Sequence, residues 1–199
     1  SKSSEIMIFD YLMRFDVDRS RDGNFVSQYW NLLIEKFSKK QLKATWVHQF
    51  IEAAATPTAK SAQQLLSKIN KKEKTTHYLF ESRLSLRIAT QTLKTYWRLV
   101  FSVPNSAAMS RAFVPSDSKL DLWPLFAHEW DQSLLGTTAM RHCILISTIQ
   151  SSLATVPHCP LGIYLMENQP WEMALIDAWK VNGHGQLIGV VNAPIRFWD

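Results

Sequence analysis

The sequence predicts an α/β fold, in which a mostly parallel sheet carries helices on both faces. Two observations support this: short apolar runs typical of buried strands recur along the chain, and stripes of apolar residues at helical spacing separate them. Strands joined through a helix run in the same direction, because the crossover returns the chain to the edge where it started. We expect residues 1–199 to form a single domain of this class, with a long loop at 104–119.

The first half of the chain predicts three pairs of strand and helix. Residues Ile6 to Phe9 form a continuous apolar run, consistent with a strand buried on both faces, and a polar loop with several Asp residues follows. Helical stripes then alternate with further apolar runs. The expected strands are 6–9, 44–51 and 77–80, and the expected helices are 24–40, 62–69 and 86–100.

The last third predicts a complete βαβ unit. Residues 161–166 and 187–191 are apolar runs, and between them apolar residues recur at i, i+3, i+4, i+7 and i+8 from Trp171. Pro170 suits the first helical turn, and Gly183 suits the left-handed position that closes a helix. Two more helices are expected before this unit, at 123–134 and 139–153, with a break at Gly136.

The net charge is +5, from 22 Lys and Arg against 17 Asp and Glu, and many lysines lie in short runs. The runs fall near predicted helix C-termini, where cations complement the helix dipole, so we interpret them as solvated helix ends. An anionic partner, such as a nucleotide-linked substrate or a membrane surface, is the alternative. The sequence contains no nucleic-acid motif, which argues against a nucleic-acid partner.

The cysteines and the hydropathy bear on metal sites and on location. Cys143 and Cys159 lack the paired spacing of a structural zinc site, so no metal is expected and both are interpreted as buried free thiols. No run approaches the roughly 20 apolar residues of a membrane helix, and no signal pattern opens the chain. We expect a cytoplasmic protein without a transmembrane segment, with peripheral contact at the inner membrane face left open.

Polar side chains follow several of the predicted strands. If these strands are parallel, the side chains share one edge of the sheet, where ligands of open α/β folds bind. Carboxylates gathered there could act as a general base, bind sugar hydroxyls or hold a cation. The alternative is that each one caps a neighbouring helix or turn. The residues placed just past a predicted strand are Asp10, Glu81, Glu167 and Asn192.

The segment Glu167-Asn168-Gln169 is the most informative part of this edge. It offers hydrogen-bond donors and acceptors beside a predicted helix N-terminus, which also attracts anions such as phosphate. Asn168 or Gln169 acting as a plain helix cap is the alternative. The phosphate loop, dinucleotide-binding, nucleophile-elbow and kinase motifs are all absent from the sequence, which disfavours those enzyme classes.

Five segments carry a family likeness. They are IFDYL at 8–12, GNFVSQYW at 23–30, the tract from His128 to Gly136, YLMENQPWE at 164–172 and GHG at 183–185. Together they resemble a family of bacterial surface-carbohydrate biosynthesis proteins, of the O-antigen and capsule type, that are glycosyltransferase-like. The resemblance implies a Rossmann-like domain, one half of a GT-B-type glycosyltransferase, with the chain as the N-terminal part of a longer two-domain protein.

The resemblance also implies an activity: transfer of a sugar from a nucleotide-sugar donor to a saccharide acceptor. Our hypothesis is that Asp10 or Glu167 accepts a proton from the acceptor hydroxyl, while Asn168 and Gln169 of the distinctive Glu-Asn-Gln stretch contact saccharide or donor. Glu81 and Asn192 would bind substrate, and no cofactor beyond the donor is expected. The competing hypothesis is a noncatalytic carbohydrate- or protein-binding module, with tryptophans as the stacking surface.

Overall fold

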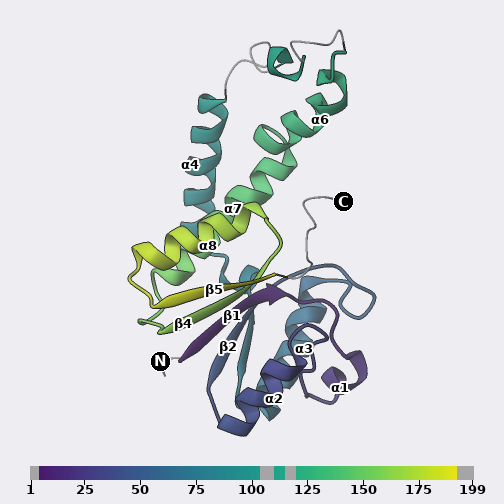
Figure 1. Ribbon diagram of the computed structural model, residues 1–199, viewed down its shortest axis with the longest axis vertical. Helices are drawn as coiled ribbons and strands as arrows, with labels where there is room; N and C mark the ends of the chain where they lie inside the picture. The colour runs from purple at the N-terminus through teal and green to yellow at the C-terminus, as the bar shows by residue number, and fades with distance from the viewer. Residues whose placement is uncertain (1–4, 104–109, 115–119, 192–199) are drawn as a thin grey trace. The chain divides into compact units, whose positions relative to one another are not determined.

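The computed structural model describes residues 5–103, 110–114 and 120–191. These residues divide into two compact units, traced in Figure 1. The sheet unit comprises Ser1–Leu84 and Thr148–Asp199, and the helical unit comprises Ser85–Ser147. The sequence predicts one domain, and the helical unit lies within it as an insertion between the third and fourth strands.

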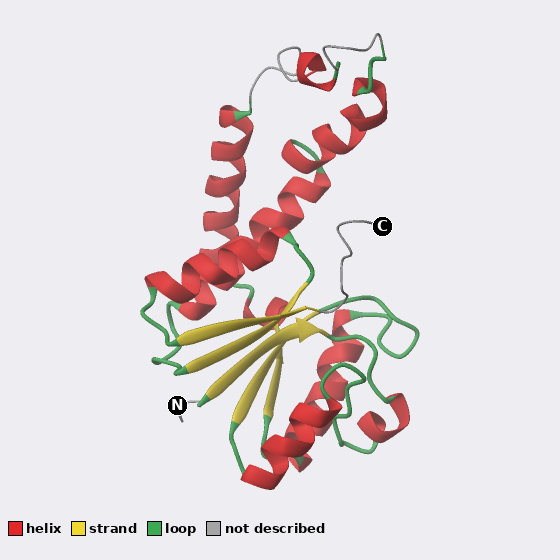
Figure 2. Ribbon diagram, viewed as in Figure 1, coloured by secondary structure: helices red, strands yellow, loops and turns green. Residues whose placement is uncertain are grey.

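A five-stranded sheet forms the centre of the sheet unit (Figure 2). All its strand pairs are parallel and the strand order is β3-β2-β1-β4-β5, which confirms the predicted α/β class and its Rossmann-like architecture. The direction of winding reverses between β1 and β4. The strands are β1 Ile6–Tyr11, β2 Ala44–Gln49, β3 Thr76–Leu79, β4 Leu161–Met166 and β5 Gln186–Val191.

Helices cover both faces of the sheet (Figure 2). One face packs on α2 and α3, where Trp30 meets Trp46 of β2 with ring centroids 6.1 Å apart. The other face packs on α8, where Trp179 meets Phe9 of β1 edge-on at 6.0 Å. The helices of the sheet unit are α1 Val17–Arg21, α2 Asn31–Lys40, α3 Ala59–Lys72 and α8 Pro170–Val181, with the 3-10 turn η1 at Phe80–Arg83.

Burial explains the composition of the central strands. All six residues of β1 are buried, as expected for an inner strand of a parallel sheet covered on both faces. In β4, a Cβ on Gly162 would lie 2.8 Å from the Trp179 ring, so the absence of a side chain lets α8 approach the sheet. Gly183 has φ +67° and follows α8, which confirms the predicted left-handed helix end.

The helical unit contains α4 Leu86–Ser102, the turn η2 Arg111–Phe113, α6 Trp123–Leu134 and most of α7 Thr137–Leu153. The predicted helices and the break at Gly136 are confirmed. The Tyr96 hydroxyl donates to the carbonyl of Leu135 at 2.5 Å, which ties α4 to the turn between α6 and α7. Of the predicted loop 104–119, only residues 110–114 lie within the described part of the chain.

The region after β1 differs from the prediction. A short helix, α1, forms in the loop expected to be irregular, because the Asp16 side chain accepts a hydrogen bond from the Arg19 amide and caps it. The next helix begins at Asn31 instead of Asn24. Residues 24–30 are held as a loop instead, since the Phe25 amide donates to the Glu73 carboxylate and Phe15 pairs with Ser27.

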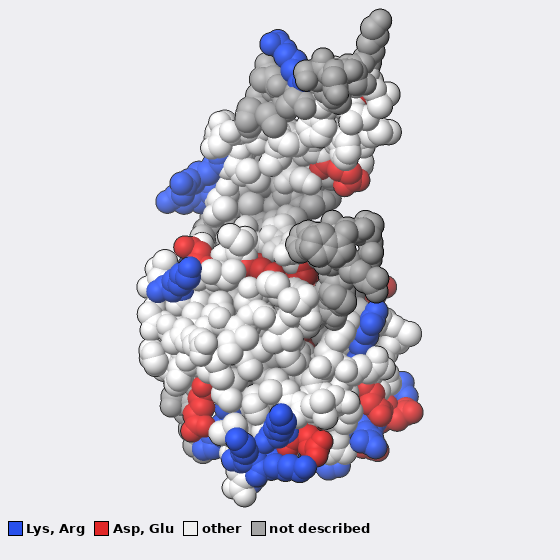
Figure 3. Space-filling view, viewed as in Figure 1, with Lys and Arg blue, Asp and Glu red and all other residues white. Residues whose placement is uncertain are grey.

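Lysines close two helices of the sheet unit, as their spacing predicts. Lys39 and Lys40 lie in the last turn of α2, and Lys71 and Lys72 lie in the last turn of α3. Figure 3 shows positive charge gathered around the end of α2. Among the helices described here, none combines the length and the apolar run needed to cross a bilayer.

Candidate functional site

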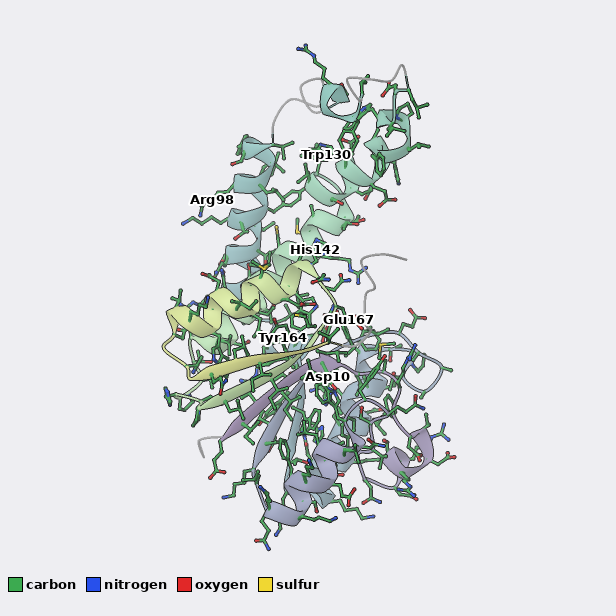
Figure 4. The ribbon with its side chains drawn as sticks, in the orientation of Figure 1. Asp10, Arg98, Trp130, His142, Tyr164 and Glu167 are labelled. Atoms are coloured by element: carbon green, nitrogen blue, oxygen red, sulfur yellow. The ribbon has the colours of Figure 1, made fainter. Side chains whose placement is uncertain are left out.

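The winding of the sheet reverses between its inner strands β1 and β4, and this point marks a candidate site at the carboxyl ends of the strands. In open α/β sheets the crevice for a ligand opens at this point, because the two neighbouring strands send their following segments to opposite faces. Tyr11 is the last residue of β1, and Glu167 directly follows β4. Figure 4 shows Glu167 at this end of the sheet.

A hydrogen-bonded chain joins the two strand ends. The indole Nε1–H of Trp171, in the first turn of α8, donates to the Tyr11 hydroxyl oxygen at 2.9 Å. The Tyr11 hydroxyl is in turn hydrogen-bonded to the Glu167 carboxylate. Tyr11 and Trp171 are both buried, and their rings meet edge-on with centroids 5.9 Å apart. The Glu167 carboxylate therefore has a buried hydrogen-bond donor beside it.

The protonation of Tyr11 follows from its surroundings. Burial raises the pKa of Tyr11 to about 12, the hydrogen bond from Trp171 opposes the rise, and the charges of Glu167 and Glu172 add to it. Tyr11 is consequently a neutral phenol at pH 7, and its hydroxyl can donate a hydrogen bond to the Glu167 carboxylate.

The loop from Glu167 to Gln169 is fixed by Glu172. The buried Glu172 carboxylate accepts hydrogen bonds from the amides of Glu167, at 2.8 Å, and of Gln169, at 2.9 Å. Asn168 adopts a left-handed backbone with φ +60°, which Asn tolerates better than most residues. Gln169 is the N-cap of α8 and Pro170 its first residue, as predicted. The exposed amides of Asn168 and Gln169 thus lie at the positive end of a helix dipole.

Asp10 is placed differently from the prediction. The prediction that it lies just past the first strand is wrong, because β1 continues to Tyr11 and Asp10 lies inside it. Successive residues of a strand point to opposite faces, so Asp10 projects away from the Tyr11 side. Its side chain is 2% exposed, and one carboxylate oxygen lies 2.5 Å from Nδ1 of His48. Its catalytic role stays a prediction.

A buried polar chain runs from Asp10 across three strands to the end of α3. His48 Nε2 lies 3.0 Å from His77 Nδ1, and His77 Nε2 lies 3.0 Å from the Thr75 hydroxyl, which donates to Glu73 at 2.7 Å. Because Thr75 has one hydrogen and gives it to Glu73, His77 donates to Thr75 through Nε2 and accepts from His48 through Nδ1.

Two residues of the buried polar chain, His77 and Glu73, have shifted pKa values. Burial lowers the pKa of His77 to about 4, despite the neighbouring Glu73, so its imidazole is neutral at pH 7. Burial alone would raise the pKa of Glu73, but hydrogen bonds from His77, the Phe25 amide and Thr75 lower it overall. The carboxylate of Glu73 therefore stays ionised while the histidine beside it is uncharged.

Glu81 and Asn192 complete the predicted set. Glu81 lies in η1 directly after β3, and its carboxylate accepts from the Phe50 amide at 3.2 Å, which joins the ends of β2 and β3. Burial raises the pKa of Glu81. Asn192 lies outside the described residues. Glu81 and Glu167 are thus at the same end of the sheet, and Tyr11 interacts with Glu167.

A cavity of about 450 Å³ lies elsewhere in the sheet unit. It opens beside β1, β2 and β3, and neither Tyr11 nor Glu167 lines it. The Arg83 guanidinium lies 5.1 Å from the centroid of the Tyr78 ring, and both residues line this cavity. No group of three or more His, Cys, Asp or Glu residues suited to a metal ion occurs in the part of the chain that the structure describes.

Sequence reasoning missed the residues that support the site. Tyr11 and Trp171 are 160 positions apart and their pattern is that of ordinary core aromatics, yet Trp171 donates to the Tyr11 hydroxyl, which lies beside Glu167. His48 lies two residues after Trp46 in β2, so both side chains are on the same buried face. A polar residue on this apolar face was the available sequence signal for the buried polar chain. Glu172 also belongs to the support of the site, since its carboxylate accepts from the amides of Glu167 and Gln169 before α8.

No family model, curated protein or solved structure matches this chain. The strand order and the strand directions therefore define the fold class.

Proposed function

We propose that this chain is the N-terminal, ligand-binding half of a glycosyltransferase acting in bacterial surface polysaccharide biosynthesis. It would help to transfer a sugar from a nucleotide-sugar donor to a saccharide acceptor. The hydrogen-bonded chain from Trp171 through Tyr11 to Glu167 is the observation that carries the proposal. It orients a carboxylate at the sheet edge where ligands of this fold class bind.

Glu167 would act on the acceptor. A carboxylate beside a neutral Tyr donor can accept the hydrogen bond of a sugar hydroxyl and take its proton. The hydroxyl oxygen would then bond to the anomeric carbon of the donor sugar, while the bond from that carbon to the phosphate oxygen breaks and the nucleoside phosphate leaves. The supporting residues Tyr11 and Trp171 are buried, so they fix this orientation without competing for ligand. Asp10 projects to the other face and is assigned to the buried polar chain in this proposal.

The neighbouring amides would provide recognition. Asn168 and Gln169 are exposed at the N-terminus of α8, where amide groups bind sugar hydroxyls and the helix dipole favours the donor's phosphates. The same residues belong to the Glu-Asn-Gln stretch that resembles the surface-carbohydrate family. The two cysteines are free and buried, which suits the reducing cytoplasm where we place the reaction.

Titration calorimetry with a panel of nucleoside diphosphates, nucleotide sugars and oligosaccharides tests the proposal. We expect binding of a nucleotide sugar, and we expect Glu167→Gln to lower the saccharide affinity about 10- to 100-fold, since a charge-assisted hydrogen bond is lost. Glu35→Gln is the matched control, because Glu35 is an exposed carboxylate on α2.

The outcomes separate the alternatives. Oligosaccharide binding without nucleotide-sugar binding would support the noncatalytic module instead. Equal affinities for Glu167→Gln and the wild type would remove Glu167 from the site, and no binding of any member of the panel would contradict the proposal.

A further inference from the structure

Helix α4 carries an apolar stripe whose side chains are exposed to solvent. The exposed fractions are 87% for Leu86, 51% for Leu93, 53% for Trp97 and 82% for Phe101. Spacings of seven, four and four residues align these side chains along one side of the helix. The rings of Trp97 and Phe101 stack with centroids 5.8 Å apart, so the stripe ends in a continuous aromatic surface.

The buried side of α4 lies opposite this stripe. Ile88 is 4% exposed and Thr92 is 3% exposed. At about 100° per residue, these two positions lie roughly half a turn around the helix axis from Leu86 and Trp97. The apolar stripe is therefore separate from the buried side of α4, and its side chains are not part of the described core.

A basic stripe runs beside the apolar one. Arg87, Lys94 and Arg98 each immediately follow a residue of the apolar stripe, and α4 contains no Asp or Glu. Figure 4 shows Arg98 projecting outward from α4, and Figure 3 shows positive charge on the surface of this helix. Exposed aromatics and a purely cationic flank on one helix are the pattern of helices that lie in a bilayer interface.

We propose that α4 docks on an anionic lipid bilayer. The aromatic and Leu side chains enter the boundary between headgroups and acyl chains, and the three cations bind the lipid phosphates. A second copy of the chain is the alternative partner for this stripe. The charges favour the bilayer, because pairing two α4 helices would bring six cations together without an acidic partner on either helix. This inference stands on α4 alone and does not depend on the proposed function.

Vesicle flotation with the full chain tests the docking. We expect the protein to float with vesicles of equal parts phosphatidylglycerol and phosphatidylcholine, and to remain in the dense fraction with phosphatidylcholine alone. Binding should weaken as salt rises, because the attraction acts between exposed charges. Equal flotation with both kinds of vesicle, or none with either, would overturn the proposal.

A triple charge variant locates the surface. Arg87→Gln with Lys94→Gln and Arg98→Gln should reduce the affinity for the anionic vesicles about 100-fold, because each surface cation contributes roughly a factor of five. The matched control removes the same charge from exposed lysines of the sheet unit. It is Lys36→Gln with Lys40→Gln and Lys68→Gln, and we expect at most about a twofold change from it.

A second variant tests insertion of the aromatics. Trp97→Ser with Phe101→Ser should reduce vesicle affinity at least about tenfold, since two large apolar side chains no longer leave water. All substituted positions are exposed, and circular dichroism tests that each variant is folded.

Two outcomes would contradict the proposal. Equal losses of vesicle affinity in the α4 triple variant and in the control triple variant would overturn the assignment to α4. Self-association that Trp97→Ser abolishes, in a protein that binds no vesicles, would show a second copy as the occupant instead.

Discussion

Replacing Asp10 with alanine is expected to lower the free energy of unfolding by about 3 to 5 kcal/mol. The Asp10 carboxylate and His48 are both buried and lie 2.5 Å apart, so removing the carboxylate leaves Nδ1 of His48 without its partner in the core. Chemical denaturation of both proteins, followed by circular dichroism, measures the difference.

The matched control for this change is Asp18→Ala. Asp18 is exposed and pairs with Arg21 on the surface of α1, so its replacement should change stability by less than about 0.5 kcal/mol. If Asp10→Ala loses less than about 1 kcal/mol yet abolishes activity or ligand binding, Asp10 is a functional group, as the sequence predicts, and its assignment to the buried chain is wrong.

Acidification from pH 7 to pH 4 is expected to remove about 3 kcal/mol of stability through His77 alone. The pKa of His77 is about 4 in the folded chain and about 6.5 in the unfolded chain, so between these values only the unfolded state binds the proton. Stability is thus fully present above pH 6.5 and is lost as the pH falls toward 4. The lowered pKa of Glu73 adds a loss of the same sign at more acidic pH.

Denaturation curves at intervals between pH 7 and pH 4 measure this slope. His77→Asn should be less stable at pH 7 and should show a much flatter dependence on pH, because the group that titrates only when unfolded is gone. His158→Asn removes an exposed histidine and should retain the wild-type slope. An unchanged slope in His77→Asn would show that another group is responsible.

Local patterns predicted the last βαβ unit almost completely. Strand periodicity, Pro170 at the first helical position and Gly183 after the helix all indicate the same boundaries, and the structure has them within one residue. Around Asp10 the signals disagree, because a carboxylate after an apolar run reads as a strand end. Only the register of β1 with β2, which places Asp10 opposite His48, explains its burial.

The sequence did not predict which side chains contact one another in the fold. The stripe on α4 correctly predicts a helix, but periodicity does not say which side packs, and Leu86 and Trp97 are exposed. Tyr11 and Glu167 meet because β1 and β4 are neighbours, a consequence of strand order and not of local sequence. The predicted position of Glu167 after its strand was sufficient to find the edge, and the structure adds the residues that support it.

A structure of this chain with the tightest-binding nucleotide sugar or saccharide from the calorimetry panel tests whether Glu167 lies in the ligand site. We expect the ligand at the carboxyl ends of β1 and β4, within hydrogen-bond distance of the Glu167 carboxylate and the Asn168 amide. A ligand seated in the cavity lined by Tyr78 and Arg83, with Glu167 and Asn168 untouched, would contradict it.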